Sequence, residues 1–182
     1  MKHHEMETYL EKLGIVYDAL GGHTLKLGIC GGAALILTDM LDRATKDIDL
    51  LFPSELPAEF WEAAKAVAQE YDLPSDWINQ GPKELSEMGL PTGYMKRAIE
   101  KRYGKNLIVF FASRLDQIHF KLYAAADRAG YHVDDLLALK PTSEEIEKAA
   151  IWSFQHDVSE GFKEIMFSML EKIGYGDVTD KI

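Results

Sequence analysis

The sequence has very little cysteine, and its single thiol, Cys30, excludes several kinds of site. One cysteine cannot form a disulfide within the chain, and no C-x-x-C pair is present to hold zinc. His119, His132 and His156 show no metal-ligand spacing among themselves. These shortages favour a cytoplasmic protein with neither a disulfide framework nor a structural zinc centre, and they predict that Cys30 is a small buried residue.

Long hydrophobic runs are also missing. No apolar stretch approaches the roughly 20 residues that a membrane-spanning helix needs, and the first residues, MKHHEMETYL, contain no apolar leader segment. We therefore expect no membrane association. Hydrophobic residues still make up 47% of the chain, enough for a real core in one domain or in a domain with a helical appendage.

Positive charge is scarce. The chain carries 20 Lys and Arg against 30 Asp and Glu, a formal net charge of −10, which argues against a surface built for indiscriminate nucleic-acid binding. One short basic strip, residues 96–105, runs against this trend and contains Lys96, Arg97, Lys101, Arg102 and Lys105. It is either the solvated part of a hairpin or a local surface that guides a polyanionic acceptor. If the strip is a strand, Lys96 and Arg102 share one face, and Arg97 and Lys101 share the other.

Apolar periodicity predicts an α+β protein. Helices are expected at residues 5–20, 33–41 and 57–71, strands at 24–30 and 45–52, and a hairpin across 94–112. Four further helices are expected at about 113–128, 131–139, 142–155 and 159–173. The prediction is an α/β core with a small mixed sheet in residues 1–115, followed by a helical region in residues 116–182.

Two aspartates, Asp47 and Asp49, interrupt an otherwise apolar strand segment. In a strand, residues i and i+2 point to the same face, so the two carboxylates would lie side by side. Such like charges repel unless a cation lies between them, and a divalent metal held by hard oxygen ligands is the usual remedy. The alternative is a pair of exposed acids on an edge strand.

A glycine pair, Gly31-Gly32, precedes the aspartates by about one helix and a turn. Adjacent glycines allow a sharp turn and bring bare backbone N–H groups close to an anion such as a phosphate. A strand, this turn, a short helix and the aspartate strand would then bring the phosphate cradle and the carboxylates to the same end of two neighbouring strands.

Gly31-Gly32 followed by Asp47-Ile48-Asp49 resembles the signature of the nucleotidyltransferase superfamily that has a DNA polymerase β-like core. The stretches GGAALIL and RATKDIDLL, with the later Lys121-Leu122-Tyr123-Ala124 and Asp135-Leu136, are further similar to a bacterial branch of largely unknown function that is related to AbiEii-type toxins.

This resemblance implies a set of roles. Asp47 and Asp49 would bind Mg²⁺ or Mn²⁺, and phosphates of an NTP such as ATP would contact Gly31, Gly32, Arg43 and Thr45. Lys121 would neutralise phosphate charge, and Asp135 would either position Lys121 or supply a further acid. The implied reaction moves an NMP from an NTP to a hydroxyl of a tRNA end, a protein or a small molecule. A toxin of this kind would have a cognate antitoxin as partner.

The sequence departs from the superfamily pattern in one respect. Larger members carry a third carboxylate on a later strand, whereas the apolar strand expected at residues 107–112 has no acid. Asp116 follows that strand but is interpreted as a helix cap, so Asp134 or Asp135 would have to supply the missing group. The alternative is a catalytically degenerate nucleotidyltransferase fold that binds a nucleotide or a partner protein.

Overall fold

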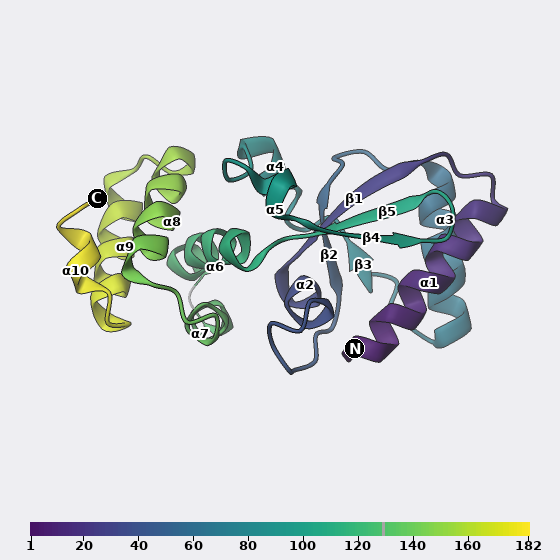
Figure 1. The fold of residues 1–182 in the computed structure, drawn as a ribbon, viewed down its shortest axis with the longest axis horizontal. Coiled ribbons are helices and arrows are strands. Elements are labelled where there is room, and N and C mark those ends of the chain that lie inside the picture. Colours follow the sequence, from purple (N-terminus) through teal and green to yellow (C-terminus); the bar gives the residue numbers. More distant parts are fainter. Residues whose placement is uncertain (129) are drawn as a thin grey trace. The chain divides into compact units, whose positions relative to one another are not determined.

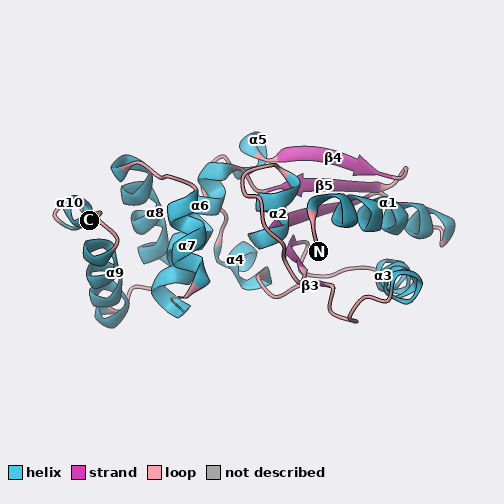
Figure 2. Ribbon diagram, turned by 90° about the horizontal axis from the view of Figure 1, so that it is seen from below, coloured by secondary structure: helices cyan, strands magenta, loops and turns pink. Residues whose placement is uncertain are grey.

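The computed structural model describes residues 1–128 and 130–182, with the backbone alone for residues 83, 84 and 88. It divides into two compact units, Met1–Ser113 and Arg114–Ile182 (Figure 1). The first unit contains a mixed five-stranded sheet with helices, and the second contains helices (Figures 1 and 2). The predicted α+β class with a helical C-terminal half is confirmed.

The sheet of the first unit has the strand order β3-β2-β1-β5-β4. Its strands are β1 (Leu25–Cys30), β2 (Ile48–Phe52), β3 (Ile78–Asn79), β4 (Ile99–Tyr103) and β5 (Leu107–Phe111). β1 pairs in parallel with β5, and β2 with β3, while β1–β2 and β4–β5 are antiparallel. β5 is buried along its whole length, as its continuous apolar run predicts for a strand with both faces covered.

One face of the sheet packs against α1 (His3–Ala19), α2 (Gly31–Leu37) and α3 (Ala58–Tyr71) (Figure 2). Ile29 of β1, Leu50 of β2 and Val109 of β5 point into this core, where they join Leu10 of α1 and Phe60 of α3. Because side chains alternate along a strand, the neighbours of these residues, including Asp49, belong to the opposite face.

The opposite face of the sheet is covered partly by aromatic rings. A register shift between Gly28 and Ile29 interrupts the alternation, so Phe52 pairs with Gly28 and its ring lies where a Cβ on Gly28 would be. The centre of the Phe52 ring is 6.0 Å from that of Tyr94 and 6.4 Å from that of Phe110. Tyr94 begins the short helix α5 (Tyr94–Arg97), and α4 (Lys83–Met88) precedes it. Asp49 lies on this face between Cys30 of β1 and Asn79 of β3.

The predicted hairpin forms, but it is shorter than expected. β4 begins only at Ile99, and the preceding Lys96 and Arg97 lie on α5, so the strand faces predicted for these two residues are wrong. The helical turn is favoured because Gly93 has φ +81° and Arg97 Nη1 donates to the Thr92 carbonyl at 2.7 Å. Two other cations of the basic strip are engaged locally, as Lys101 pairs with Glu7 of α1 at 2.5 Å and Arg102 with Glu100 at 3.1 Å.

The second unit consists of α6 (Arg114–Arg128), α7 (Tyr131–Ala138), α8 (Ser143–His156), α9 (Glu160–Lys172) and α10 (Gly176–Thr179). The first four match the predicted helices, and α10 was not predicted. α8 starts with a reciprocal capping box, in which Glu145 N donates to Thr142 Oγ1 at 3.2 Å and Thr142 N donates to Glu145 Oε2 at 2.9 Å. No helix among the described residues has the length and apolar character needed to cross a bilayer.

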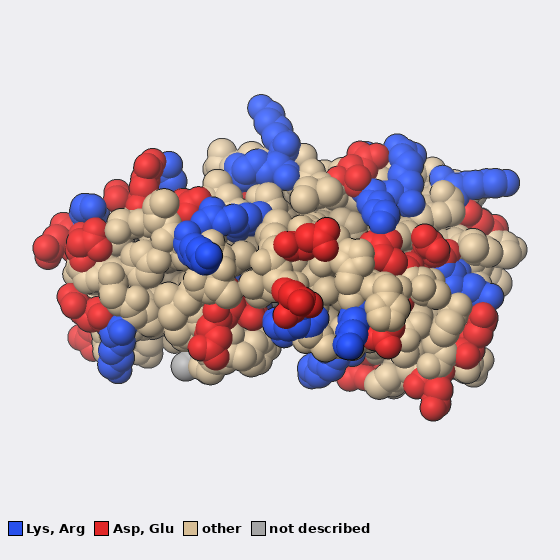
Figure 3. Space-filling view, turned by 60° about the horizontal axis from the view of Figure 1, so that its bottom comes forward, with Lys and Arg blue, Asp and Glu red and all other residues tan. Residues whose placement is uncertain are grey.

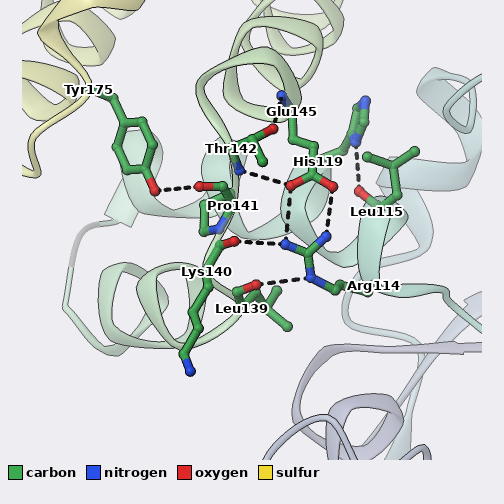
Figure 4. A network of polar contacts seen from close by, with 9 residues as sticks. All are labelled: Arg114, Leu115, His119, Leu139, Lys140, Pro141, Thr142, Glu145 and Tyr175. Atoms are coloured by element: carbon green, nitrogen blue, oxygen red, sulfur yellow. Dashed lines mark hydrogen bonds and ion pairs between the residues drawn. The ribbon is translucent and has the colours of Figure 1, made fainter.

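A single arginine fastens the start of α6 to the connection between α7 and α8 (Figure 4). Arg114 Nε donates to the Leu139 carbonyl at 2.9 Å, Nη2 donates to the Lys140 carbonyl at 2.8 Å, and Nη1 donates to Glu145 Oε1 at 2.6 Å. The Arg114 hydrogen bond holds the pKa of Glu145 below its usual value. The planar guanidinium fits this fork of acceptors in a way that a lysine cannot.

Candidate active site

The glycine turn and Asp49 are in direct contact. β1 ends at Cys30, and Gly31 opens α2 with φ +68°, a left-handed conformation that favours glycine. A Cβ added to Gly31 would lie only 2.5 Å from Asp49 Oδ2. The Asp49 carboxylate therefore occupies the space that any larger residue at Gly31 would need.

Arg43 and Thr45 lie over the second glycine. A Cβ on Gly32 would be 2.9 Å from Thr45 Oγ1 and 3.1 Å from Arg43 Nη2. The loop between α2 and β2 thus returns two hydrogen-bond donors to the turn between β1 and α2. The four residues expected to contact phosphates lie together, while the contact with phosphate itself stays a prediction.

Asn79 is a further neighbour of Asp49, and it was not predicted from the sequence as a site residue. Asp49 is paired with Cys30 of β1 on one side and with Asn79 of β3 on the other. Asn79 Oδ1 accepts a hydrogen bond from Gly81 N at 2.8 Å, and a Cβ on Gly81 would be 3.8 Å from Asp49 Oδ1. β3 spans only two residues, too few for alternation to reveal it, and the remaining signal was the polar Asn79-Gln80-Gly81 turn after two apolar residues.

Asp47 lies immediately before β2 and its side chain is 19% exposed. Its carboxylate is 3.6 Å from Lys46 Nζ, and its carbonyl accepts from Thr45 Oγ1 at 3.4 Å. Among the described residues, no three His, Cys, Asp or Glu side chains converge on a metal-sized position.

The oxygen donors that are present nevertheless suit magnesium. Mg²⁺ commonly takes one or two protein carboxylates, keeps several waters and completes its shell with substrate phosphates. Asp47 and Asp49 carry donor groups of this kind, and the side-chain carbonyl oxygen of Asn79, paired with Asp49 across the β2–β3 ladder, is a further hard donor. Joint metal binding by the two aspartates stays a prediction.

In the second unit, Lys121 and Asp135 form a buried ion pair. Lys121 Nζ lies 2.6 Å from Asp135 Oδ2, and the two side chains are only 5% and 7% exposed. The Lys121 ammonium also lies 5.5 Å from the centre of the Tyr131 ring. Asp134 is exposed, and Asp116 in the first turn of α6 is fully buried. The catalytic roles of Lys121 and Asp135 stay predictions.

His132 adjoins this ion pair and was also not selected from the sequence as a site residue. Burial lowers the pKa of His132, and the nearby Lys121 cation lowers it further. Its ring centroid is 4.1 Å from that of Tyr131. The histidine next to the Lys121–Asp135 pair is therefore held toward its neutral form.

The chain that forms this site can be compared with known protein families. A family model described as "Nucleotidyltransferase of unknown function (DUF6036)" matches residues 13–149, about three quarters of the chain. The chain belongs to this family. The matched part of this DUF6036 member includes Gly31, Asp49, Lys121 and Asp135.

Neither a curated protein nor a solved structure matches the chain. The family match confirms the resemblance to nucleotidyltransferases of unknown function. The narrower likeness to AbiEii-type toxins stays a prediction.

Proposed function

We propose that this DUF6036 member is a metal-dependent nucleotidyltransferase of the cytoplasm. An acceptor hydroxyl attacks the α-phosphorus of an NTP, a new P–O bond forms, the bond to the β-phosphate oxygen breaks, and pyrophosphate leaves. The observation that carries the proposal is the Asp49 carboxylate, which is held against the Gly31 turn with Arg43 and Thr45 above it.

The residues of the first unit would have different roles in the reaction, according to their chemistry. The backbone N–H groups of the glycine turn, the Arg43 guanidinium and the Thr45 hydroxyl would bind the triphosphate. Asp47 and Asp49 would hold Mg²⁺ or Mn²⁺, which when bound offsets the negative charge of the phosphates. This arrangement explains why a loop of an acidic protein returns a guanidinium to a glycine turn.

The Lys121–Asp135 pair is proposed to serve the same reaction. Because the surrounding dielectric constant is low, the buried Lys121 ammonium interacts with nearby charges more strongly than an exposed one would. Asp135, at 2.6 Å, fixes the direction in which the ammonium points. We propose that Lys121 stabilises the leaving pyrophosphate and that Asp135 positions it.

The deciding experiment is label transfer. The protein is incubated with Mg²⁺ or Mn²⁺ and each α-labelled NTP, in parallel with total tRNA, lysate protein and a mixture of small hydroxylated metabolites. Label should move to one acceptor class and be lost in Asp49→Asn. Asp72→Asn is the matched control, because Asp72 is an exposed residue with φ +52°, a conformation that asparagine also tolerates. Transfer that survives in Asp49→Asn would reject the proposal.

One observation favours a second candidate, a binding module without catalysis. The side chain beside Asp49 is the neutral amide of Asn79 rather than another carboxylate. A module of this kind would bind Mg²⁺-NTP, shown by a raised melting temperature, but would transfer no label to any acceptor.

A toxin function is a narrower form of the first candidate. Induced expression should then arrest bacterial growth, Asp49→Asn should relieve the arrest, and a neighbouring gene should encode a protein that neutralises it. Growth that continues unchanged on expression of the active enzyme would reject the toxin role and leave the enzymatic proposal standing.

A further inference from the structure

A cavity of about 410 Å³, open to solvent and lined mostly by exposed or partly exposed polar side chains, lies between the start of α1 and the loop that follows α2. Nitrogen-bearing side chains line one part of it, namely Lys2, His3, His4 and Arg43, and the carboxylates of Asp39 and Asp42 line another. The volume is within the range of small-molecule sites.

The cavity wall is held in place by the backbone. Thr45 N donates to the Met1 carbonyl at 3.0 Å, which ties the loop to the start of α1. Asp39, two residues after the end of α2, has a left-handed conformation with φ +57°, and its N–H donates to the Ile36 carbonyl at 3.1 Å. A ligand would therefore meet a preformed wall rather than having to order a loop, which lowers the entropic cost of binding.

The lining chemistry selects a ligand with two kinds of group. Lys2, His4 and Arg43 can donate hydrogen bonds to a phosphate, and cations add Coulomb attraction. Carboxylates such as Asp42 accept hydrogen bonds, which suits the hydroxyl groups of a sugar. Asp39 is partly engaged already, because its Oδ1 lies 3.8 Å from His3 Nε2.

Arg43 places the cavity next to the nucleotide site without making the two the same. Its guanidinium reaches Gly32, with Nη2 at 3.1 Å from the position of a Cβ there, while the residue also lines the cavity. Lys2, His4 and Asp42 have no role in the turn, so they can be changed without altering the residues that surround Asp49.

We propose that this cavity is a second binding site, for a phosphate ester that also carries sugar hydroxyl groups, such as a nucleoside monophosphate. The phosphate contacts Lys2, His4 and Arg43, and the hydroxyl groups face Asp42. The site adjoins the proposed metal and triphosphate site and shares only Arg43 with it, and its occupancy does not require nucleotidyl transfer.

The test is calorimetric titration of the full chain with AMP in the presence of EDTA. Lys2→Ala/His4→Ala should weaken AMP binding at least tenfold. The matched control, Lys26→Ala/His23→Ala, removes one exposed lysine and one exposed histidine of the same unit away from the cavity and should change the affinity less than twofold. Absence of AMP binding, or equal binding by both variants, overturns the proposal.

Two further titrations distinguish the proposed site from the nucleotide site and from a site that binds phosphate alone. Asp49→Asn should bind AMP as the parent does, and loss of binding there would mean that AMP occupies the nucleotide site, which overturns the proposal. Asp42→Asn should weaken AMP but not inorganic phosphate, and inorganic phosphate that binds as tightly as AMP would reject the sugar-hydroxyl part. Melting temperatures within 2 °C of the parent, roughly half a kcal/mol for a chain of this size, show that each variant is folded. A failure of label transfer alters none of these outcomes.

Discussion

Gly31 meets two demands that no other residue meets together. Its φ of +68° costs most residues roughly 1 kcal/mol or more, and a Cβ there would also lie 2.5 Å from Asp49 Oδ2. The backbone cost affects stability alone, whereas the displacement of the carboxylate affects the proposed chemistry.

We therefore expect Gly31→Ala to abolish label transfer and the thermal stabilisation by Mg²⁺-NTP. Gly21→Ala is the matched control, because Gly21 has φ +80° and nothing within 4 Å of an added Cβ. It should lose a similar amount of stability, about 1 kcal/mol, and keep transfer. Differential scanning fluorimetry with and without Mg²⁺-NTP, together with the labelling assay, measures both effects. Equal activity in the two variants would contradict the proposed placement of Asp49.

The Lys121–Asp135 pair requires a test that separates stability from reaction. Removing one partner of a buried pair leaves an uncompensated charge, so Asp135→Ala should cost about 3–5 kcal/mol. Replacing both, as in Lys121→Met/Asp135→Leu, should recover most of that loss because apolar groups of similar size tolerate the site.

Urea denaturation measures the stabilities, and label transfer is followed under conditions in which each variant is folded. If Lys121 serves the reaction, the double variant is stable and inactive. Transfer that persists in the double variant would show that the pair is only structural.

At the scale of elements, Gly14 allows α1 to lie close to β4. A Cβ on Gly14 would overlap the backbone carbonyl of Tyr103, and the backbone cannot move aside as a side chain can. This close approach lets Tyr103 of β4 reach Glu7 of α1, with its hydroxyl 3.2 Å from Glu7 Oε1.

We expect Gly14→Ala to destabilise the protein by about 1–3 kcal/mol, the usual cost of overpacking. Gly161→Ala on α9 is the control, since nothing lies within 4 Å of its added Cβ, and alanine is about 0.5–1 kcal/mol better than glycine in a helix. Chemical denaturation of both variants should give changes of opposite sign. A neutral Gly14→Ala would contradict the close packing of α1 on β4.

Elements with a complete local signal could be predicted from the sequence. The Thr142–Glu145 capping box marks α8, and the apolar run at residues 107–111 marks β5. α5 was not predicted because four residues are too few to show helical periodicity. Its turn depends on Gly93 and on the packing of Tyr94 against Phe52. Asn79 was not predicted either, because its strand has only two residues and is recognisable only by its pairing with β2.

The candidate site could be predicted only as far as local geometry determines it. The glycine turn and the aspartate spacing are written in short stretches of sequence, and Asp49 does lie against Gly31. The return of Arg43 and Thr45 to Gly32 follows from the path of a loop that no periodicity describes. The ion pair of Lys121 with Asp135 requires α6 and α7 to pack, which the sequence pattern of either helix alone does not specify.

At the scale of the whole molecule, the net negative charge argues against a large surface for binding nucleic acid. On the face drawn in Figure 3, acidic and basic side chains are interspersed, in keeping with a net charge of −10. Lys101 and Arg102 of the basic strip already pair with glutamates, so less positive charge is left there to guide a polyanion than the sequence implies. Non-specific RNA binding should accordingly be weak.

The buried core of the first unit is contained within residues 6–111, so we expect a fragment of residues 1–113 to fold by itself. It should unfold cooperatively and gain thermal stability from Mg²⁺-NTP. It should transfer no label, because it lacks Lys121 and Asp135. Circular dichroism melting and the labelling assay test this, with the full-length Lys121→Ala variant as the reference for lost transfer. A fragment that transfers label at the rate of the full chain would exclude the second unit from catalysis.

Cys30 closes β1 directly opposite Asp49, and its side chain is buried. Cys30 is the sole cysteine, so a thiol-alkylating reagent reacts with one sulfur atom in the unmodified protein. Because this sulfur is buried, it reacts only while that end of the sheet is transiently open. The alkylation rate under native conditions then measures the local opening equilibrium beside Asp49. A ligand of the glycine turn would slow that rate in proportion to its occupancy, which allows substrates to be screened by mass spectrometry before any acceptor is known.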